Sequence, residues 1–280
     1  DWRLIGKPTQ RLDVTDKVLG KPIYGIDVRV PGMLHAALAQ CPVFKGTLKS
    51  VDESKAAGMK GVHKVVKLKD AVAVVAESWW QARKALDALT IEWNAGESGN
   101  VSSGSIREFL LGGLTATEAG VGRAQGSPAE VFAQASRRIE ADYAVPFLAH
   151  ATMEPQNCTA HVTGDRAEIW VPTQNGEAAM ASAAHALGIP TRNVTVHKTM
   201  LGGGFGRRGA TQDFVPPAVL IAREAGRPVK VLWSREEDTG HDYYRPVAMA
   251  RMAAGLDSDG MPLAWHVRMT GNSIWGTLMP

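Results

Sequence analysis

The sequence contains few of the residues that mark several common protein classes. Only two of its 280 residues are cysteines, Cys41 and Cys158, which is too few for a disulfide framework or a zinc site of their own. Lys and Arg number 31 against 28 Asp and Glu, so the net charge of +3 gives no reason to expect nucleic acid as a partner. No apolar run approaches the roughly 18 residues of a membrane span. The longest, residues 71–76, has the length of a strand.

The composition that remains is that of a globular protein. Hydrophobic residues make up 45% and charged residues 21% of the chain, which is enough apolar material to bury a core and to exclude global disorder. None of the eight histidines is spaced with cysteines or carboxylates as metal ligands are, so no metal held by protein ligands is expected. The chain begins Asp1-Trp2-Arg3 without an initiator methionine and stops at Met279-Pro280. We therefore expect it to be a piece of a longer protein.

The first part of the chain, residues 1–95, has the pattern of a small α+β domain. We expect strands where apolar residues alternate or run together and helices where they follow a cap. The predicted strands are 23–28, 33–38, 62–68, 71–76 and 90–93, and the predicted helices are 50–57 and 79–88, the latter capped by Ser78.

Residues 96–127 are rich in Gly, Ser, Thr and Ala and predict a linker with at most a short helix at 105–111. The third segment, residues 128–280, again alternates helices and strands. Its predicted helices are 129–135, 176–187 and 214–225, and its predicted strands are 138–145, 158–162, 167–171, 194–196, 229–233, 247–256 and 263–269. Gly188 and Gly226 stand where helices end.

A glycine-rich loop lies between a predicted strand and a predicted helix. Gly202, Gly203, Gly204 and Gly206 surround Phe205, and Arg207 and Arg208 follow. Glycines permit positive φ and close approach of a ligand to backbone amides, and the arginines would add charge for an anionic partner. The pattern fits neither the P-loop nor the dinucleotide fingerprint. Tight packing alone is the alternative.

Four motifs in a fixed order give the loop a context. They are His150-Ala-Thr-Met-Glu-Pro-Gln-Asn157, Pro172-Thr-Gln-Asn175, the loop itself and Ser234-Arg-Glu-Glu-Asp238. Together they resemble the molybdenum-binding subunit of the xanthine dehydrogenase/aldehyde oxidase family, and the chain's first residues with its 235–246 segment resemble the isoquinoline 1-oxidoreductase β-subunit-like branch. The resemblance implies an α/β-hammerhead domain over residues 1–95 and the N-terminal part of a molybdopterin-binding domain over residues 128–280.

The resemblance also implies a reaction, its cofactors and its partner proteins. Such subunits oxidise aldehydes or N-heterocycles with oxygen from water, using a molybdenum–molybdopterin cofactor, in bacteria in its cytosine dinucleotide form. Electrons leave through 2Fe-2S clusters of a small partner subunit, with cytochrome c as an acceptor. This branch commonly works at the periplasmic face of the cytoplasmic membrane. The remaining molybdenum-binding region would lie C-terminal to this chain or in a separate subunit.

Individual residues acquire roles by the same resemblance. The loop residues 202–207 and Gln174 would bind the cofactor, with Gln174 either bonding in the pocket or supporting the loop. Phe205 would stack near a planar substrate, or merely pack. Arg235 would orient the substrate and stabilise charge on it, the alternative being a surface ion pair with Glu236 to Asp238. Glu154, with Pro155, is expected to shape a turn and anchor the hairpin that follows rather than perform acid–base chemistry.

Three departures from the family pattern are expected to matter. Leu148 stands where other members have a glutamine near the metal, and Gly209 where some have a substrate-binding glutamate. The family's catalytic glutamate lies in a Gly-x-Gly-Glu segment that these residues do not contain. The fragment alone is therefore expected to be inactive, and a non-catalytic binding or assembly module that keeps the family fold is the alternative function.

Overall fold

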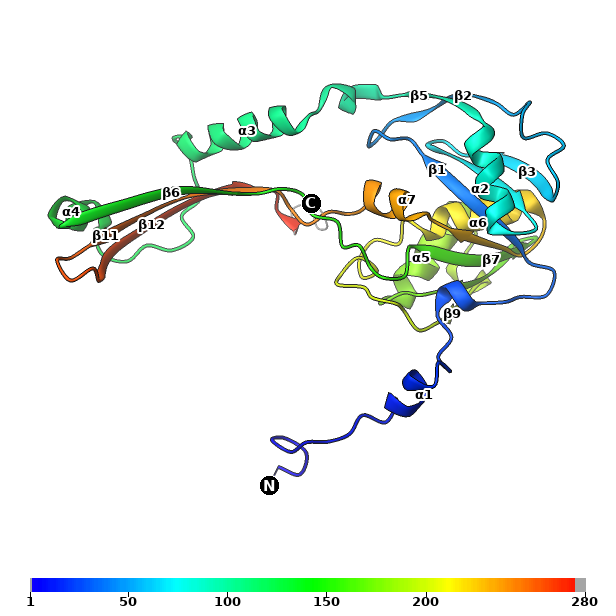
Figure 1. Cartoon of the computed structure of the whole chain (residues 1–280), viewed down its shortest axis with the longest axis horizontal. Coiled ribbons are helices and arrows are strands. Elements are labelled where there is room, and N and C mark those ends of the chain that lie inside the picture. The colour runs from blue at the N-terminus through cyan, green and yellow to red at the C-terminus, as the bar shows by residue number, and fades with distance from the viewer. Residues whose placement is uncertain (1, 275–280) are drawn as a thin grey trace. The chain divides into compact units, whose positions relative to one another are not determined.

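The computed structural model describes residues 2–274 (Figure 1). These residues form two compact units, each of which is made from two stretches of the chain: residues 2–96 with 151–242, and residues 97–150 with 243–274. The predicted boundary after residue 95 lies at the end of the first stretch. The segment after residue 128, in contrast, is shared between both units, because strands from its middle join the sheet that the first stretch begins.

A seven-stranded sheet organises the first unit. Its order is β3-β4-β1-β10-β7-β8-β9, parallel only between β1 and β10 and between β8 and β9. The strands are β1 (Leu34–Gln40), β3 (Val62–Lys67), β4 (Ala71–Ala76), β7 (Asn157–Thr163), β8 (Arg166–Val171), β9 (Val194–Lys198) and β10 (Val229–Leu232). A separate pair, β2 (Thr47–Asp52) and β5 (Thr90–Asn94), is antiparallel.

Helices cover both faces of the seven-stranded sheet. The helical elements of this unit are α1 (Val14–Val18), η1 (Gly25–Asp27), α2 (Trp79–Ala88), α5 (Gly176–Leu187), η3 (Thr191–Asn193), α6 (Val215–Ala225) and α7 (Arg235–Gly240). Helices α5 and α6 pack on one face, with Ala73 and Val75 of β4, and α2 packs on the other, with Val72 and Val74. Every residue of β4 is consequently buried, which explains why this strand is apolar throughout instead of alternating.

Local capping chemistry sets the helix ends where the sequence predicts them. The Ser78 hydroxyl accepts a hydrogen bond from the Gln81 amide at the start of α2, and the Asn175 side chain accepts one from the Ala178 amide at the start of α5. Gly188 ends α5 and Gly226 ends α6, both in the left-handed conformation that glycine adopts most readily.

The second unit is built on a three-stranded antiparallel sheet. Its order is β12-β11-β6, from β6 (Arg137–Val145), β11 (Ala248–Leu256) and β12 (Pro262–Gly271). Helices α3 (Ser103–Thr115) and α4 (Pro128–Gln134) contact β11 and β12, and the turn η2 (Gly96–Asn100) precedes α3. The predicted α+β class is confirmed, and no helix within residues 2–274 is long and apolar enough to cross a membrane.

Three sequence predictions need correction. Residues 23–28 form no strand: Gly25–Asp27 is a single 3-10 turn, and the Asp27 carboxylate accepts a hydrogen bond from the Tyr24 amide at its start. Residues 50–57 form no helix, because the Asp52 side chain accepts a hydrogen bond from the Ser54 amide and closes a turn after β2. The predicted linker holds the 13-residue helix α3, whose Leu110 and Leu114 are buried against Met249.

Candidate functional site

The glycine-rich loop connects β9 to α6 through a backbone of unusual conformation. Gly203 and Gly206 have φ of 105° and 102°, and Phe205 has φ of 55°. The Arg207 amide donates to the Gly204 carbonyl at 2.8 Å, which closes a turn whose two central residues both have positive φ. Turns of this mirror-image type favour glycine. Phe205 is one of three non-glycine residues with positive φ among the described residues.

The space around two of the loop glycines is also limited, by the Cβ of Glu154 at Gly202 and by the flexible end of the Gln174 side chain at Gly204. A Cβ atom on Gly202 would lie 2.5 Å from the Cβ of Glu154, and one on Gly204 would lie 2.7 Å from Oε1 of Gln174. Non-bonded carbon and oxygen atoms do not approach this closely without displacement of one of them. The Gln174 side chain thus lies directly against the loop, and its role, bonding in the pocket or supporting the loop, stays a prediction.

Four consecutive amides of the loop face no protein acceptor. Within the described part of the chain, the N–H groups of Gly203, Gly204, Phe205 and Gly206 donate no hydrogen bond. Successive backbone amides in a turn with positive φ create a concave region of positive potential that suits an anionic or oxygen-rich group. The loop therefore presents donors whose natural partner is a ligand.

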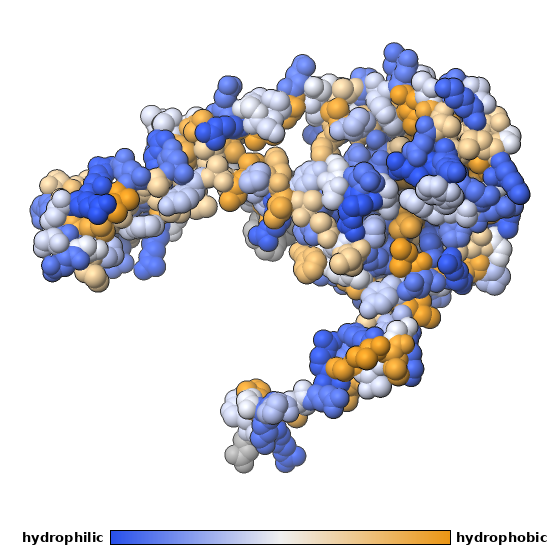
Figure 2. Space-filling view, viewed as in Figure 1, coloured by the Kyte–Doolittle hydropathy of each residue, from blue (hydrophilic) through white to orange (hydrophobic). Residues whose placement is uncertain are grey.

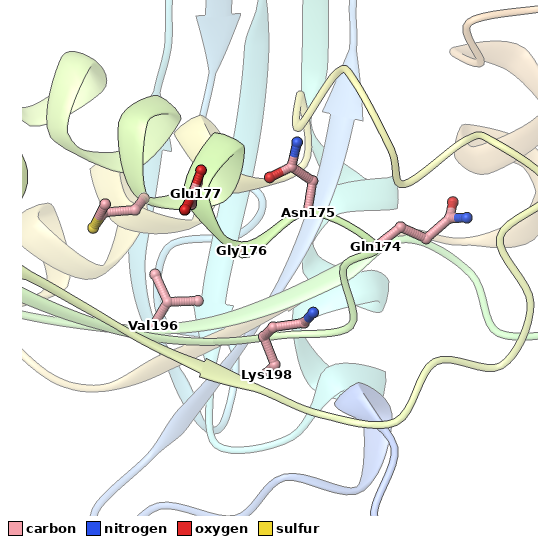
Figure 3. Close-up of a pocket in the computed structure, with 7 residues that line it drawn as sticks. Gln174, Asn175, Gly176, Glu177, Val196 and Lys198 are labelled. Atoms are coloured by element: carbon pink, nitrogen blue, oxygen red, sulfur yellow. The ribbon is translucent and has the colours of Figure 1, made fainter.

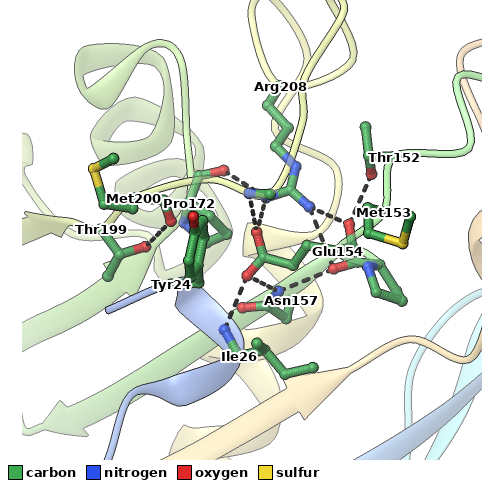
Figure 4. A network of polar contacts seen from close by, with 12 residues as sticks. Tyr24, Ile26, Thr152, Met153, Glu154, Asn157, Pro172, Thr199, Met200 and Arg208 are labelled. Carbon is green, nitrogen blue, oxygen red and sulfur yellow. Dashed lines mark hydrogen bonds and ion pairs between the residues drawn. The ribbon is translucent and has the colours of Figure 1, made fainter. Parts of the chain in front are cut away.

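Glu154 holds this loop in place through a buried carboxylate (Figure 4). Its Oε2 accepts hydrogen bonds from the Gly202 amide and from Nη1 of Arg208, both at 2.8 Å. Its Oε1 accepts from the Ile26 amide at 2.9 Å and from Nδ2 of Asn157 at 3.0 Å. The side chain joins the glycine loop, β7 and the Gly25–Asp27 turn. The expectation was a turn and an anchor for the hairpin; the contacts of Glu154 with the glycine loop and the Gly25–Asp27 turn were missed because its partners lie 48, 54 and 128 residues away.

The two arginines of the loop point into the protein, which corrects the role predicted for them. Arg207 is 2% exposed and forms ion pairs of 2.6 Å with Asp213 and with Asp242. Arg208 is fully buried, where it binds Glu154 and the main-chain carbonyls of Glu154 and Pro172. Because carboxylates of the same chain neutralise both guanidinium groups, Arg207 does not offer its charge to a cofactor.

The structure gives the exposure of Phe205 and the hydrogen-bond partners of Arg235, the two residues predicted to contact the substrate. Phe205 is 77% exposed, so it does not pack in the core of the described residues, and its stacking on a substrate stays a prediction. Arg235 forms a 2.6 Å ion pair with Asp238, as the alternative prediction stated, although burial raises the pKa of that carboxyl. Its Nη2 also donates to the carbonyls of Thr152 and Met153 at 2.7 and 2.9 Å.

Arg235 nevertheless lies close to the loop. The side chain of Thr152 is 3.4 Å from the position of a Cβ on Gly203, so Arg235 fixes the backbone segment that borders the loop. Its contact with a substrate stays a prediction.

An open pocket borders the same region. It has a volume of about 470 Å³ and lies at the start of α5 (Figure 3). Its lining comprises Gln174, Asn175, Gly176, Glu177, Met180, Val196 and Lys198. Gln174 therefore touches both the pocket and Gly204.

Lys230 is a further buried group that sequence reasoning missed. Its Nζ donates to the Ile26 and Val28 carbonyls at 2.5 and 2.6 Å, and burial, with Arg29 nearby, lowers the pKa of this amine to about 8. A Cβ on Gly25 would lie 2.4 Å from Oδ1 of Asn157. The chain from Gly25 to Val28 is thus fixed both by Lys230 and by Glu154. Neither contact could be predicted from a local sequence pattern, because the partners lie far apart in the chain.

The comparisons with known proteins agree with this geometry. A family model, the molybdopterin cofactor-binding domain, matches residues 116–276. The beta subunit of isoquinoline 1-oxidoreductase from Brevundimonas diminuta is 35% identical over all of this chain and 37% of its own length. A nicotinate dehydrogenase subunit from Pseudomonas putida is 30% identical over 95% of this chain and 23% of its own length. The chain thus spans little more than a third of the length of these relatives, or less.

A solved structure shows the same fold. The crystal structure of quinoline 2-oxidoreductase from Pseudomonas putida 86 matches 96% of this chain and 39% of its own chain, with a TM-score of 0.73 and 22% identity. The chain belongs to the xanthine dehydrogenase/aldehyde oxidase family of molybdenum-binding proteins, as the resemblance of its motifs indicated. The predicted division into a hammerhead domain, a linker and a cofactor-binding part stays a prediction.

The residues present fit a molybdenum–pterin group. Among residues 2–274, no group of three or more His, Cys, Asp or Glu side chains could hold a metal ion. The free amides of residues 203–206 and the space kept open by Gly202 and Gly204 provide donors and room for such a group.

Proposed function

We propose that this chain is part of a molybdenum hydroxylase subunit that oxidises an aldehyde or an N-heterocycle, with loop 202–206 against the cofactor. The observation that carries this proposal is the row of free amides of residues 203–206, in a loop whose positive φ angles at Gly203 and Gly206 favour glycine. The molybdenum–molybdopterin group supplies the two-electron oxidation, in which water provides the oxygen. The names of the relatives concern N-heterocycles in two cases, isoquinoline and nicotinate, and an aldehyde in a third that is 32% identical, so they support both substrate classes.

The contribution of this chain would be binding and orientation. The amides of Gly203, Gly204, Phe205 and Gly206 would donate hydrogen bonds to oxygen atoms of the bound group, and Glu154 would keep those amides in position through Gly202. The exposed ring of Phe205 would lie against a planar substrate. Arg235 would hold the Thr152–Met153 backbone beside the loop. A fixed arrangement of donors lowers the reorganisation needed during reaction.

The remaining parts of the proposal rest on the resemblance of the motifs. They are the cytosine dinucleotide form of the cofactor, 2Fe-2S clusters in a small partner subunit, cytochrome c as acceptor and a location at the periplasmic face of the cytoplasmic membrane. A general base is also required, and we propose that it belongs to the region of the longer subunit that this chain does not contain.

Gly203→Ala tests the proposal. A side chain at φ of 105° is strained, and its Cβ would lie 3.3 Å from the Phe205 ring, so the amides would be displaced. We expect the molybdenum and pterin content of the assembled enzyme to fall at least tenfold. The measurements are metal analysis by mass spectrometry and fluorescence of the oxidised pterin, with activity towards N-heterocycles and aldehydes measured beside them.

Gly188→Ala is the matched control. Gly188 also has positive φ, at 68°, but a Cβ there meets nothing within 4 Å, and it lies at the end of α5 rather than in the loop. The control should lose stability without losing cofactor. Wild-type protein that contains neither molybdenum nor pterin would refute the proposal and favour the non-catalytic module.

A further inference from the structure

The three-stranded sheet of the second unit has one apolar face that neither helix of this unit covers within residues 2–274. In an antiparallel sheet, residues directly opposite each other point to the same side. The register places Trp265, Ala254 and Ile139 in one row and Met269, Ala250 and Tyr143 in another.

Four successive rows of this kind can be read from the register, and we call their side of the sheet the bare face. The two rows not yet named are Val267–Met252–Ala141 and Gly271–Ala248–Val145. None of the twelve positions carries a charged side chain.

Helices α3 and α4 lie on the opposite face. Met249, which is buried with Leu110 and Leu114 of α3, is paired with Thr270 and Ala144 and therefore alternates with the bare face. Phe132 of α4 lies against Gly255, on the same side as Met249. Both helices of this unit are accounted for, and neither reaches the bare face.

Large side chains on the bare face are consequently exposed. Trp265 is 58%, Met269 68% and Tyr143 57% exposed. Hydrophobic residues at the surface of the region formed by α3, α4 and the three strands are visible in Figure 2. Antiparallel sheets with one face in water normally alternate apolar and polar residues, and a contiguous exposed apolar patch indicates an interaction site. Strands β6 and β12 do alternate, with Glu140, Asp142 and Arg268 on the side of α3 and α4, so their apolar side is the one that these helices leave uncovered.

The length of the relatives indicates what covers this face. The chain matches 37% of the Brevundimonas relative and 23% of the Pseudomonas relative, so well over half of each relative has no counterpart here. We propose that the bare face docks against that remaining part of the longer molybdenum subunit. The inference rests on the proposed function, in which this chain works as part of such a subunit.

A site-specific photo-cross-link tests the docking. The chain is expressed from its own gene in the cells that it comes from, with p-benzoylphenylalanine in place of Trp265. The matched control carries the same group in place of His266, the next residue on β12, which is exposed on the opposite face. Cross-linked peptides are identified by mass spectrometry.

We expect the Trp265 position to cross-link at least fivefold more than the His266 position, to peptides whose sequences align with the unmatched part of the relatives. Cross-links to a second copy of this chain would overturn the proposal in favour of a dimer. An equal or absent yield at the two positions would also overturn it. Molybdenum and pterin are measured in the same preparations, so that the docking and the proposed function can fail separately.

Discussion

The two main sheets of this protein are covered to different degrees. The seven-stranded sheet has helices on both faces, and its strand β4 is buried along its whole length. The three-stranded sheet has helices on one face, and residues such as Trp265 and Met269 are exposed on the other. Residues 2–274 thus contain one sheet whose two faces are both covered and one whose apolar face stays exposed.

The charged side chains of the two units also differ in how deeply they are buried. In the first unit, charged side chains such as Glu154, Arg207 and Arg208 are buried and paired. In the second, the ion pair between Arg251 and Asp142 is more than 40% exposed on both sides and is expected to contribute less than about 1 kcal/mol. The candidate site therefore lies where burial makes polar contacts strong and specific.

Glu154→Gln should have the largest effect on stability. The substitution keeps the shape of the side chain but leaves the buried Arg208 guanidinium without its carboxylate, which typically costs about 3–5 kcal/mol. Chemical denaturation measures the loss, and hydrogen exchange should show faster exchange of the Gly202 and Ile26 amides. Glu168→Gln is the control, because Glu168 pairs with His197 at the surface. Equal losses in the two variants would contradict the assigned role of Glu154.

Lys230→Met should change the pH dependence of stability. The pKa of Lys230 is lowered from 10.5 to about 8 in the folded protein, so between these values the unfolded chain binds more protons and stability rises with pH. This rise corresponds to about 3 kcal/mol in total and should be missing in the variant. Denaturation curves of both proteins from pH 7 to 10.5 measure it. Lys198→Met, at an exposed position, should retain the rise, and a variant profile parallel to wild type would contradict the prediction.

Leu114→Ala should destabilise the second unit by about 2 kcal/mol, at the lower end of the cost of removing a buried leucine, because its cluster contains few fully buried residues. Hydrogen exchange should increase in α3 and β11 and stay unchanged in β4. Phe109→Ala lies on the same helix but at an 81% exposed position, and should change stability by less than about 0.5 kcal/mol. Faster exchange in β4 as well would mean that the two sheets unfold together.

Trp265→Lys should have the smallest effect on the stability of the isolated chain, within about 0.5 kcal/mol, because the indole is exposed. Its effect should appear in solubility instead, as weaker self-association in sedimentation experiments and less binding of an apolar dye. His266→Lys places the same charge on the opposite face and should leave both unchanged. A large loss of stability in Trp265→Lys would show that the bare face is already packed within this chain.

Much of the fold could be predicted because the responsible interactions are local. Ser78 caps α2 and Gly188 ends α5 through contacts within four residues, and the apolar run of β4 indicated a buried strand. The predictions for residues 23–28 and 50–57 were wrong because the pattern of apolar residues competed with hydrogen bonds to Asp27 and Asp52 that favour turns. The helix α3 was underestimated because its glycines and serines resemble a linker.

The sequence alone determined the family, the place of the glycine loop and the need for glycine within it, since these depend on residue type and order. The tertiary structure decided which way the loop side chains point. Arg207 and Arg208 follow the loop directly, yet both turn inward, because the carboxylates of Asp213, Asp242 and Glu154 lie there and are not stable if buried unpaired. Such pairings join residues far apart in the chain, and only the folded backbone brings them together.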